Sequence, residues 1–293
     1  MIKELVVISG KGGTGKTSVT ASFAVLADHP VIADCDVDAA DLHLILSPKV
    51  TERHDFYSGH QAVIRQEECS NCGLCVDYCR FDAIKLRGNS PSDLEIYIDP
   101  VSCEGCGLCV AMCPFKVIDF PEQLCGEWMV SETRCGTMVH AKLGVAAENS
   151  GKLVSLVRQE AQRIAEEKQS SVVIVDGPPG IGCPVISAVT GASAVLVVTE
   201  PTLSGEHDME RVLSLAKYFN IPAMVSVNKW DINKDMTERI EQKATEAGAN
   251  ITGRICYDRA VTDAQMQELA VVEMDTEAAE DIRKIWDNIR GQI

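Results

Sequence analysis

A glycine-rich stretch near the start of the chain has the composition of a phosphate-binding loop. Residues 9–17 read Ser-Gly-Lys-Gly-Gly-Thr-Gly-Lys-Thr, after the apolar run 5–8 and before a helical pattern over 18–27. Glycines let successive backbone N–H groups converge on phosphate oxygens, and the N-terminus of the next helix adds partial positive charge. Lys16 is placed to reach the terminal phosphates of a nucleotide, and the Thr17 hydroxyl can bind Mg²⁺. A glycine-rich turn that binds nothing is the alternative, and the strand–loop–helix context disfavours it.

Acidic residues follow two other apolar runs. One run ends in Asp34-Cys35-Asp36-Val37-Asp38, and another, over 172–175, ends in Asp176. The carboxyl ends of parallel strands meet at one edge of an α/β sheet, where such folds bind ligands. Asp176 is therefore a candidate to hold Mg²⁺ through its water shell. The acids of the first segment could instead only cap the helix expected at 39–46.

Eight of the thirteen cysteines fall in two copies of one spacing, 34 residues apart. The copies are Cys69-x2-Cys72-x2-Cys75-x3-Cys79 and Cys103-x2-Cys106-x2-Cys109-x3-Cys113. Flanking residues repeat too, so the segment is an internal duplication. This spacing is typical of bacterial two-cluster ferredoxins, in which the fourth cysteine of each run ligates the other cluster.

The spacing thus predicts two [4Fe–4S] centres with crossed ligands. The first would be held by Cys69, Cys72, Cys75 and Cys113, and the second by Cys103, Cys106, Cys109 and Cys79. Arg80 follows Cys79 where the pattern usually has a proline, which removes no ligand. Zinc is the competing metal, disfavoured by eight cysteines at such tight spacing.

The phosphate loop carries a family resemblance because it contains a second lysine, Lys11. The sequence K-G-G-T-G-K-T resembles the deviant phosphate loop of the MinD/ParA/Mrp ATPases and of the nitrogenase iron protein. In that family the extra lysine crosses a nucleotide-sandwich dimer to the partner's phosphates. The resemblance thus implies an ATP-dependent homodimer, or a heterodimer with a paralogue. It also implies that Asp36 orients the attacking water, with Asp38 as a secondary candidate.

The same resemblance implies a full set of site residues. ATP would be bound by Gly10, Lys11, Gly12, Gly13, Thr14, Gly15, Lys16, Thr17, Ser18 and Asn228. Lys11, Lys16 and Asp36 would be catalytic, and Thr17 and Asp176 would hold Mg²⁺. By itself, Asn228-Lys229-Trp230-Asp231 also resembles the guanine-reading motif of GTPases, but in MinD-type ATPases the asparagine contacts adenine. ATP is therefore the preferred nucleotide.

Four further residues are of types that can bind a metal or a cluster. Cys125 and Cys135 are more readily interpreted as buried small hydrophobes, and His140 as structural. Cys183 lies seven residues after Asp176, where the nitrogenase iron protein has a cysteine that ligates a cluster shared between subunits. The C-x-x-C that Mrp-type carriers use is absent, so ligation and a buried or transiently metallated thiol both remain open for Cys183.

The alternation of strands and helices predicts an α/β fold, a doubly wound and mostly parallel sheet. We expect residues 1–60 and 121–293 to form this P-loop ATPase domain and residues 61–120 to form an inserted ferredoxin domain, with a turn at 89–92. A C-terminal helix from Thr276 has an apolar stripe. MinD proteins use such a helix to bind membrane, but this one lacks excess Lys and Arg on its polar face, so we expect it to cover the sheet.

Composition excludes several classes of partner. The formal net charge of −16 disfavours nucleic acid and anionic membrane as partners. No apolar run reaches about 18 residues and no signal peptide is evident, so a cytoplasmic protein is expected. Cysteines in such a protein are expected to bind metal rather than form disulfides.

These features predict a protein that couples ATP hydrolysis to iron–sulfur chemistry. In one interpretation it assembles or carries clusters for a client, and its ferredoxin domain supplies electrons. In the other it is an ATP-gated reductase for a redox partner, in the manner of the nitrogenase iron protein. A positioning ATPase with a structural ferredoxin fits poorly, because the basic surface and membrane helix that it needs are missing.

Overall fold

The computed structural model describes residues 2–88, 94–144 and 150–293, which form two compact units. The larger unit contains residues 2–54, 127–143 and 150–293. The second, which we call the cysteine unit, contains the described residues between 55 and 126 together with Gly144. Each unit is described by itself below.

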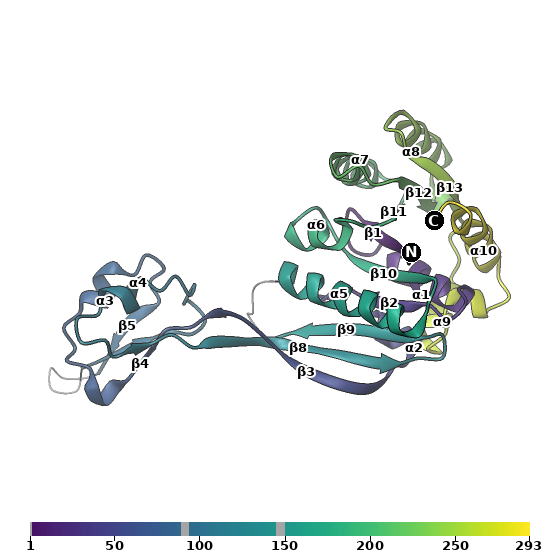
Figure 1. The fold of residues 1–293 in the computed structure, drawn as a ribbon. Coiled ribbons are helices and arrows are strands. Elements are labelled where there is room, and N and C mark those ends of the chain that lie inside the picture. Colours follow the sequence, from purple (N-terminus) through teal and green to yellow (C-terminus); the bar gives the residue numbers. More distant parts are fainter. Residues whose placement is uncertain (1, 89–93, 145–149) are drawn as a thin grey trace. The chain divides into compact units, whose positions relative to one another are not determined.

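A nine-stranded sheet of described residues organises the larger unit (Figure 1). In order across the sheet, its strands are β13 (Asn250–Ile255), β12 (Ala223–Asn228), β11 (Ala194–Thr199), β1 (Lys3–Ser9), β10 (Val172–Pro179), β2 (Val31–Asp34), β9 (Thr137–Leu143), β8 (Glu122–Glu132) and β3 (Lys49–His60). From β13 to β9 every neighbouring pair is parallel. The predicted fold class is confirmed.

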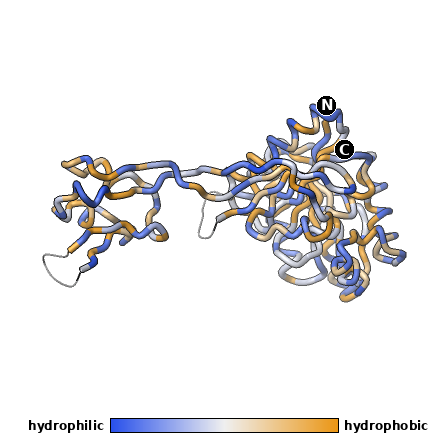
Figure 2. Tube along the Cα trace, turned by 90° about the horizontal axis from the view of Figure 1, so that it is seen from below, coloured by the Kyte–Doolittle hydropathy of each residue, from blue (hydrophilic) through white to orange (hydrophobic). Residues whose placement is uncertain are grey.

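Helices cover both faces of this sheet. They are α1 (Lys16–Leu26), α2 (Leu42–Leu46), α5 (Ser150–Lys168), α6 (Cys183–Val189), α7 (Leu203–Tyr218), α8 (Lys234–Glu246), α9 (Ala260–Met266) and α10 (Glu277–Arg290). The helices α1 and α10 lie on one face, and α5, α6, α7 and α8 lie on the other (Figure 1). Hydrophobic segments run through the interior of this unit (Figure 2).

The C-terminal helix packs against the sheet, as predicted. Thr276 caps α10, because its side chain accepts a hydrogen bond from the N–H of Ala279 at 3.2 Å. Four residues of the predicted apolar stripe are buried in the core, namely Ile282, Ile285, Trp286 and Ile289, whereas its fifth member, Ile293, lies beyond the end of the helix and is only partly buried. In the part of the chain that the structure describes, no helix has the length and apolar composition needed to cross a bilayer.

Three strands of the sheet were not predicted. Strand β3 is mostly exposed and rich in charged residues, so it lacks the alternation of polar and apolar residues that marks a half-buried strand. It is the edge strand, and charged side chains protect an edge from unwanted pairing. Strands β8 and β9 form a hairpin, closed by the N–H of Thr133 donating to the carbonyl of Gly136 at 3.0 Å.

The cysteine unit repeats one backbone pattern twice. Its elements are β4 (Val63–Ile64), α3 (Leu74–Tyr78), β5 (Ile84–Arg87), β6 (Glu95–Ile98), α4 (Leu108–Met112) and β7 (Ile118–Asp119), with β4 paired to β7 and β5 to β6. Residues 71, 73 and 82 have φ of 52°, 81° and 52°, and residues 105, 107 and 116 have φ of 59°, 73° and 55°. The duplication read from the sequence is therefore present in the backbone, 34 residues apart.

The limits of the cysteine unit are wider than the predicted domain limits of 61 and 120. The strands β3 and β8 continue through positions 55 and 126, where the contacts divide the chain. An unbroken strand leaves no glycine- or proline-rich signal at such a boundary. The predicted turn at 89–92 falls outside the described residues.

Candidate functional site

The phosphate loop runs from the end of β1 to the start of α1 and depends on its glycines. Gly13 and Gly15 have φ of 80° and 89°, in the left-handed region that favours glycine. A Cβ at Gly15 would lie 2.4 Å from Nδ2 of Asn228, and one at Gly10 would lie 2.2 Å from Cβ of Asp208. The loop is thus shaped by close neighbours as well as by its own backbone.

Lys16 lies among the predicted catalytic and metal-binding side chains. Its Nζ is 2.9 Å from Oδ1 of Asp176 and 3.3 Å from Oδ2 of Asp36, and its side chain is 6% exposed. Thr17 Oγ1 donates to Oδ2 of Asp176 at 2.9 Å. Burial alone would lower the pKa of Lys16, but the charges of Asp176 and Asp36 outweigh it and raise that pKa above its ordinary value. The structure thus brings these four residues together around a protonated ammonium group.

Asp34 belongs to the same cluster, although no individual role was predicted for it. It is fully buried, and its Oδ1 accepts the N–H of Asp36 at 3.2 Å, while Oδ2 has no hydrogen-bond partner among the described residues. Burial first, and the charge of Asp176 second, raise the pKa of Asp34 well above its ordinary value. Asp38, the secondary candidate, is exposed. The Asp-x-Asp pattern at a strand end was the signal that could have identified Asp34.

The cluster contains three carboxyl groups, of Asp34, Asp36 and Asp176, and one ammonium group, of Lys16. This arrangement fits a divalent cation. Oxygen ligands and excess negative charge are what Mg²⁺ prefers. Burial, the largest cause, also raises the pKa of Asp36 above its ordinary value, although the charge of Lys16 opposes it. Thr17 and Asp176 remain our candidates to hold the ion.

We expect Asp34→Asn to stabilise the nucleotide-free protein, by on the order of 1–3 kcal/mol, because a buried charge without a full set of partners is costly. The pKa of Asp34 is higher in the folded state than in the unfolded state, so the wild type loses stability as pH rises from the unfolded-state pKa to the folded-state pKa. The stabilisation by Asp34→Asn should therefore grow with pH between these two pKa values. Urea unfolding in EDTA measures it, with exposed Asp38→Asn as the control. A loss of stability in Asp34→Asn at neutral pH would contradict this prediction.

A cavity of about 580 Å³ opens beside the phosphate loop, a size typical of small-molecule sites. Its lining includes Gly12, Gly13, Thr14, Gly15, Lys16, Thr17, Ser18, Asp36, Pro179, Asn228, Lys229, Cys256, Tyr257, Asp258, Val261 and Gln265. Asn228 Nδ2 donates to the carbonyl of Thr14 at 2.8 Å. Asp231, the last residue of the Asn-Lys-Trp-Asp motif, accepts the N–H of Tyr257 on its Oδ1 at 2.7 Å. The carboxylate of this motif is therefore bound by the backbone.

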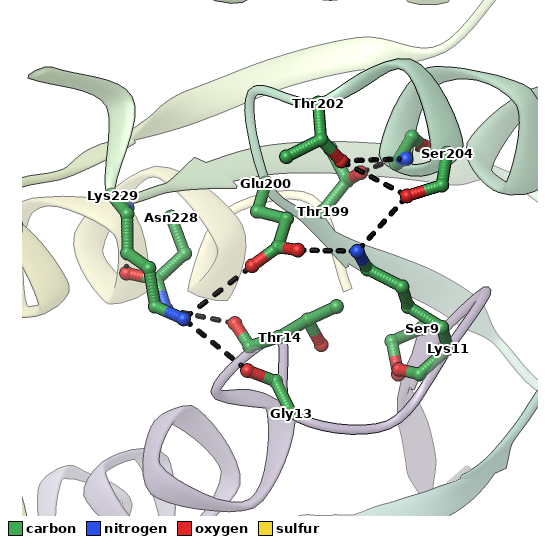
Figure 3. Close-up of polar contacts among 11 residues, drawn as sticks. Ser9, Lys11, Gly13, Thr14, Thr199, Glu200, Thr202, Ser204, Asn228 and Lys229 are labelled. Carbon is green, nitrogen blue, oxygen red and sulfur yellow. Dashed lines mark hydrogen bonds and ion pairs between the residues drawn. The ribbon is translucent and has the colours of Figure 1, made fainter. Parts of the chain in front are cut away.

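Lys11, the second lysine of the phosphate loop, has its ammonium group bound by side chains of its own chain (Figure 3). Its Nζ donates to Oγ of Ser204 at 3.0 Å and forms an ion pair with Glu200. Lys229 Nζ is 3.4 Å from Oε2 of the same glutamate. Glu200 and Ser204 were not identified from the sequence, because they follow β11 and lie 189 and 193 positions after Lys11.

The eight cysteines of the two runs line two separate cavities in the cysteine unit. One cavity is lined by Cys69, Cys72, Cys75 and Cys113, and the other by Cys79, Cys103, Cys106 and Cys109. The remaining walls are largely apolar and include Ile64, Ile96 and Ile118 in the first and Ala62, Ile84 and Ile98 in the second. Four thiols around an apolar cavity are a donor set that fits a [4Fe–4S] cluster. The structure thus groups the cysteines crosswise, and their ligation of clusters remains a prediction.

The two cavities differ in what holds their cysteine loops. A Cβ at Gly105 would lie 2.3 Å from the carbonyl oxygen of His60, and one at Gly107 would lie 3.3 Å from the ring of Phe120. The rings of His60 and Phe120 stack with centroids 4.8 Å apart. At Gly73, the counterpart of Gly107, a Cβ would meet nothing within 4 Å among the described residues. The loop of the second cavity thus lies close against the end of β3 at Gly105 and against the ring of Phe120 at Gly107.

The remaining candidate ligands line neither of these two cavities. Cys125 is buried, with its Sγ 3.0 Å from the carbonyl of Ser58, and Cys135 is half-buried against the core. Buried His140 shares a 2.8 Å hydrogen bond with the Ser131 hydroxyl, and burial lowers its pKa to about 4. Cys183 begins α6 and is exposed, so the buried-thiol interpretation of this residue is wrong.

Comparisons with known proteins agree on both parts of the chain. Residues 52–117 match the family described as 4Fe-4S dicluster domain. The cell division ATPase MinD of Pyrococcus furiosus has the same fold, with a TM-score of 0.59 at 17% identity and 100% of both chains covered. MinD of Pyrococcus horikoshii, solved with Mg-ADP, gives a TM-score of 0.58 at 16% identity, over 99% of this chain and 96% of that one. The chain thus has a MinD/ParA-like P-loop ATPase fold with an inserted dicluster ferredoxin domain.

A relative in sequence defines the family more closely. The uncharacterized protein MJ0578 of Methanocaldococcus jannaschii is 33% identical over 237 residues, which cover 80% of each chain. A second uncharacterized protein of that organism, MJ0579, is 27% identical over 233 residues, covering 78% of this chain and 80% of the relative. The chain belongs to the family of MJ0578.

Proposed function

We propose that this protein is an ATPase in which binding of Mg·ATP and dimerisation control iron–sulfur chemistry in the inserted domain. The observation that carries the proposal is the presence, in one chain, of a phosphate loop whose lysine contacts Asp36 and Asp176 and of two cavities lined by four thiols each. The MinD-like fold of this chain and the match of residues 52–117 to the 4Fe-4S dicluster domain support the same combination.

The residues of the loop have separate roles in this proposal. Lys16 neutralises charge on the transferring phosphoryl group, and Lys11 does so across the dimer. Bound Mg²⁺ would supply further charge neutralisation, held by Thr17 and Asp176. Asp36 accepts a hydrogen bond from the attacking water and orients it.

Adenine is the base that the geometry favours. In a guanine-reading motif the aspartate carboxylate must face the base, whereas Asp231 here accepts a backbone N–H from Tyr257 at 2.7 Å. Asn228, by contrast, lines the cavity and is fixed by its bond to Thr14. Asn228 is thus our candidate for contact with adenine.

The ATPase cycle has two candidate functions, which differ in their chemistry. The first is assembly or carriage of metal clusters for a client, with the two internal clusters supplying electrons. The exposed position of Cys183 at the start of α6 makes its thiol accessible as a ligand for such cargo. The second output is ATP-gated, low-potential electron transfer. It is favoured by the grouping of all eight motif cysteines into two four-thiol cavities within one chain, as permanent clusters require.

The experiment is an anaerobic redox titration followed by EPR, with and without Mg·ATP, combined with transfer of cluster to an apo-ferredoxin acceptor. Assembly or carriage predicts transfer accelerated by Mg·ATP at unchanged potentials. Electron delivery predicts a potential lowered by about 60 mV, a tenfold change in a one-electron equilibrium. Both effects should vanish in Lys16→Ala. Potentials and transfer that both ignore nucleotide would contradict the proposed coupling.

A further inference from the structure

The two cavities of the cysteine unit are lined by equivalent residues of the internal duplication. With one exception, every residue that lines the first cavity has a counterpart, 34 positions away in the sequence, that lines the second. The paired apolar residues are Ile64 and Ile98, Leu74 and Leu108, Ile96 and Ala62, Phe115 and Phe81, Val117 and Ala83, and Ile118 and Ile84. The chain thus holds an internal comparison, in which two sites with the same four-thiol donor set differ at few positions.

One pair of lining residues differs in charge. Ser70 lines the first cavity, and its counterpart Glu104 lines the second, directly after Cys103. Both residues are exposed. Among the described residues, Glu104 is the single acidic or basic residue in the lining of either cavity. The second cavity therefore has a carboxylate in its wall where the first has a neutral hydroxyl.

The exception to the pairing is Pro114, whose counterpart is Arg80. Pro114 lines the first cavity, whereas Arg80 is exposed and is not part of the lining of the second. The positive charge of Arg80 opposes that of Glu104. A charge in the wall of a cavity acts over a shorter distance and through less water than a charge outside it. The net effect at the second cavity therefore has the sign of Glu104.

We propose that Glu104 makes the second site of the cysteine unit the harder of the two to reduce, so that an electron from a low-potential one-electron donor resides at the first site. This inference rests on the proposed function, because it assumes that both thiol sets hold a cluster. Reduction adds one negative charge at a site, and it neither forms nor breaks a bond. The carboxylate of Glu104 repels that charge, so the lower potential belongs to the second site. A redox partner would then draw the electron from the first site.

The test is an anaerobic redox titration of the intact protein without nucleotide, followed by EPR. We expect two separate midpoint potentials in the wild type. Glu104→Gln keeps the size of the side chain and removes its charge, so the lower potential should rise and the upper one should not move. The expected rise is about two- to fivefold in a one-electron equilibrium constant, or about 20–40 mV, because water screens an exposed carboxylate.

The duplication also offers a reciprocal variant. Ser70→Glu places a carboxylate at the equivalent position of the first cavity, where the side chain is exposed, and should lower the upper potential by a similar factor. Glu122→Gln is the matched control, because it removes an exposed carboxylate of the same unit that lines neither cavity. The shift in Glu104→Gln should shrink in about 1 M KCl, because salt screens exposed charges.

The outcomes separate this inference from the proposed function. One midpoint shared by both sites, an unchanged lower potential in Glu104→Gln, or a shift that persists in high salt would overturn this inference alone. The titration contains no nucleotide, so none of these results bears on control by Mg·ATP. Protein that holds no iron after anaerobic reconstitution would overturn the cluster step of the proposed function, and this inference with it.

Discussion

Lys16→Ala is expected to lower the affinity for Mg·ATP at least 100-fold and to abolish ATP hydrolysis. The ammonium of Lys16 is the positive charge nearest to Asp36 and Asp176, at 3.3 and 2.9 Å. Without it, buried carboxyl groups would face the phosphates uncompensated, and charge-assisted bonds to phosphate are among the strong ones. A 100-fold loss corresponds to about 2.8 kcal/mol. Isothermal titration calorimetry and phosphate release measure the two effects.

The controls for this prediction must separate lost binding from lost folding. Lys217→Ala, at an exposed position of α7, should bind and hydrolyse ATP as the wild type does. Removing one partner of a buried ion pair can cost about 3–5 kcal/mol of stability. The double variant Lys16→Ala/Asp34→Asn relieves part of that charge and should recover stability without recovering nucleotide binding. Hydrolysis by Lys16→Ala within tenfold of the wild type would show that another site binds ATP.

The local motifs were predictable because their functional residues lie close together in the sequence. The phosphate loop, the strand that carries Asp176 and the cysteine runs each place their residues within one turn, one strand or one short repeat, although β10 continues past Asp176 to Pro179. Parallel strands then align those ends, so Asp34 and Asp176 are register partners of β2 and β10. The position of Asp36 beside Lys16 follows from that alignment, which the strand–helix alternation predicts.

Other features depend on tertiary contacts that leave no local pattern. Glu200 meets Lys11 only because β11 lies next to β1 in the sheet, and strand order is not contained in either segment. Strand β3 was missed because its exposed, charged residues resemble a loop. For Cys183, ligation and a buried or transiently metallated thiol were both left open, because its exposure at the start of α6 depends on packing that its neighbours in the sequence do not reveal.

Cys113→Ser is expected to remove the cluster of the other motif, not the cluster of its own. Cys113 follows Cys103, Cys106 and Cys109 in sequence, but it lines the cavity of Cys69, Cys72 and Cys75. A [4Fe–4S] cluster needs its thiolate ligands, so iron should fall from about eight to about four atoms per chain. Iron analysis and EPR of the dithionite-reduced protein measure the loss, and Cys135→Ser, outside both cavities, should retain the full iron content.

Two double variants determine which cluster has been lost. If Cys72 and Cys113 serve the same cluster, Cys72→Ala/Cys113→Ser should still hold about four iron atoms, as either single variant does. Cys106→Ala/Cys113→Ser should hold almost none, because Cys106 lines the second cavity. The reverse result, with iron lost in the Cys72 pair and kept in the Cys106 pair, would show that each motif holds its own cluster. That outcome would contradict the crossed arrangement, because Cys113 would then have to turn from the first cavity into the second.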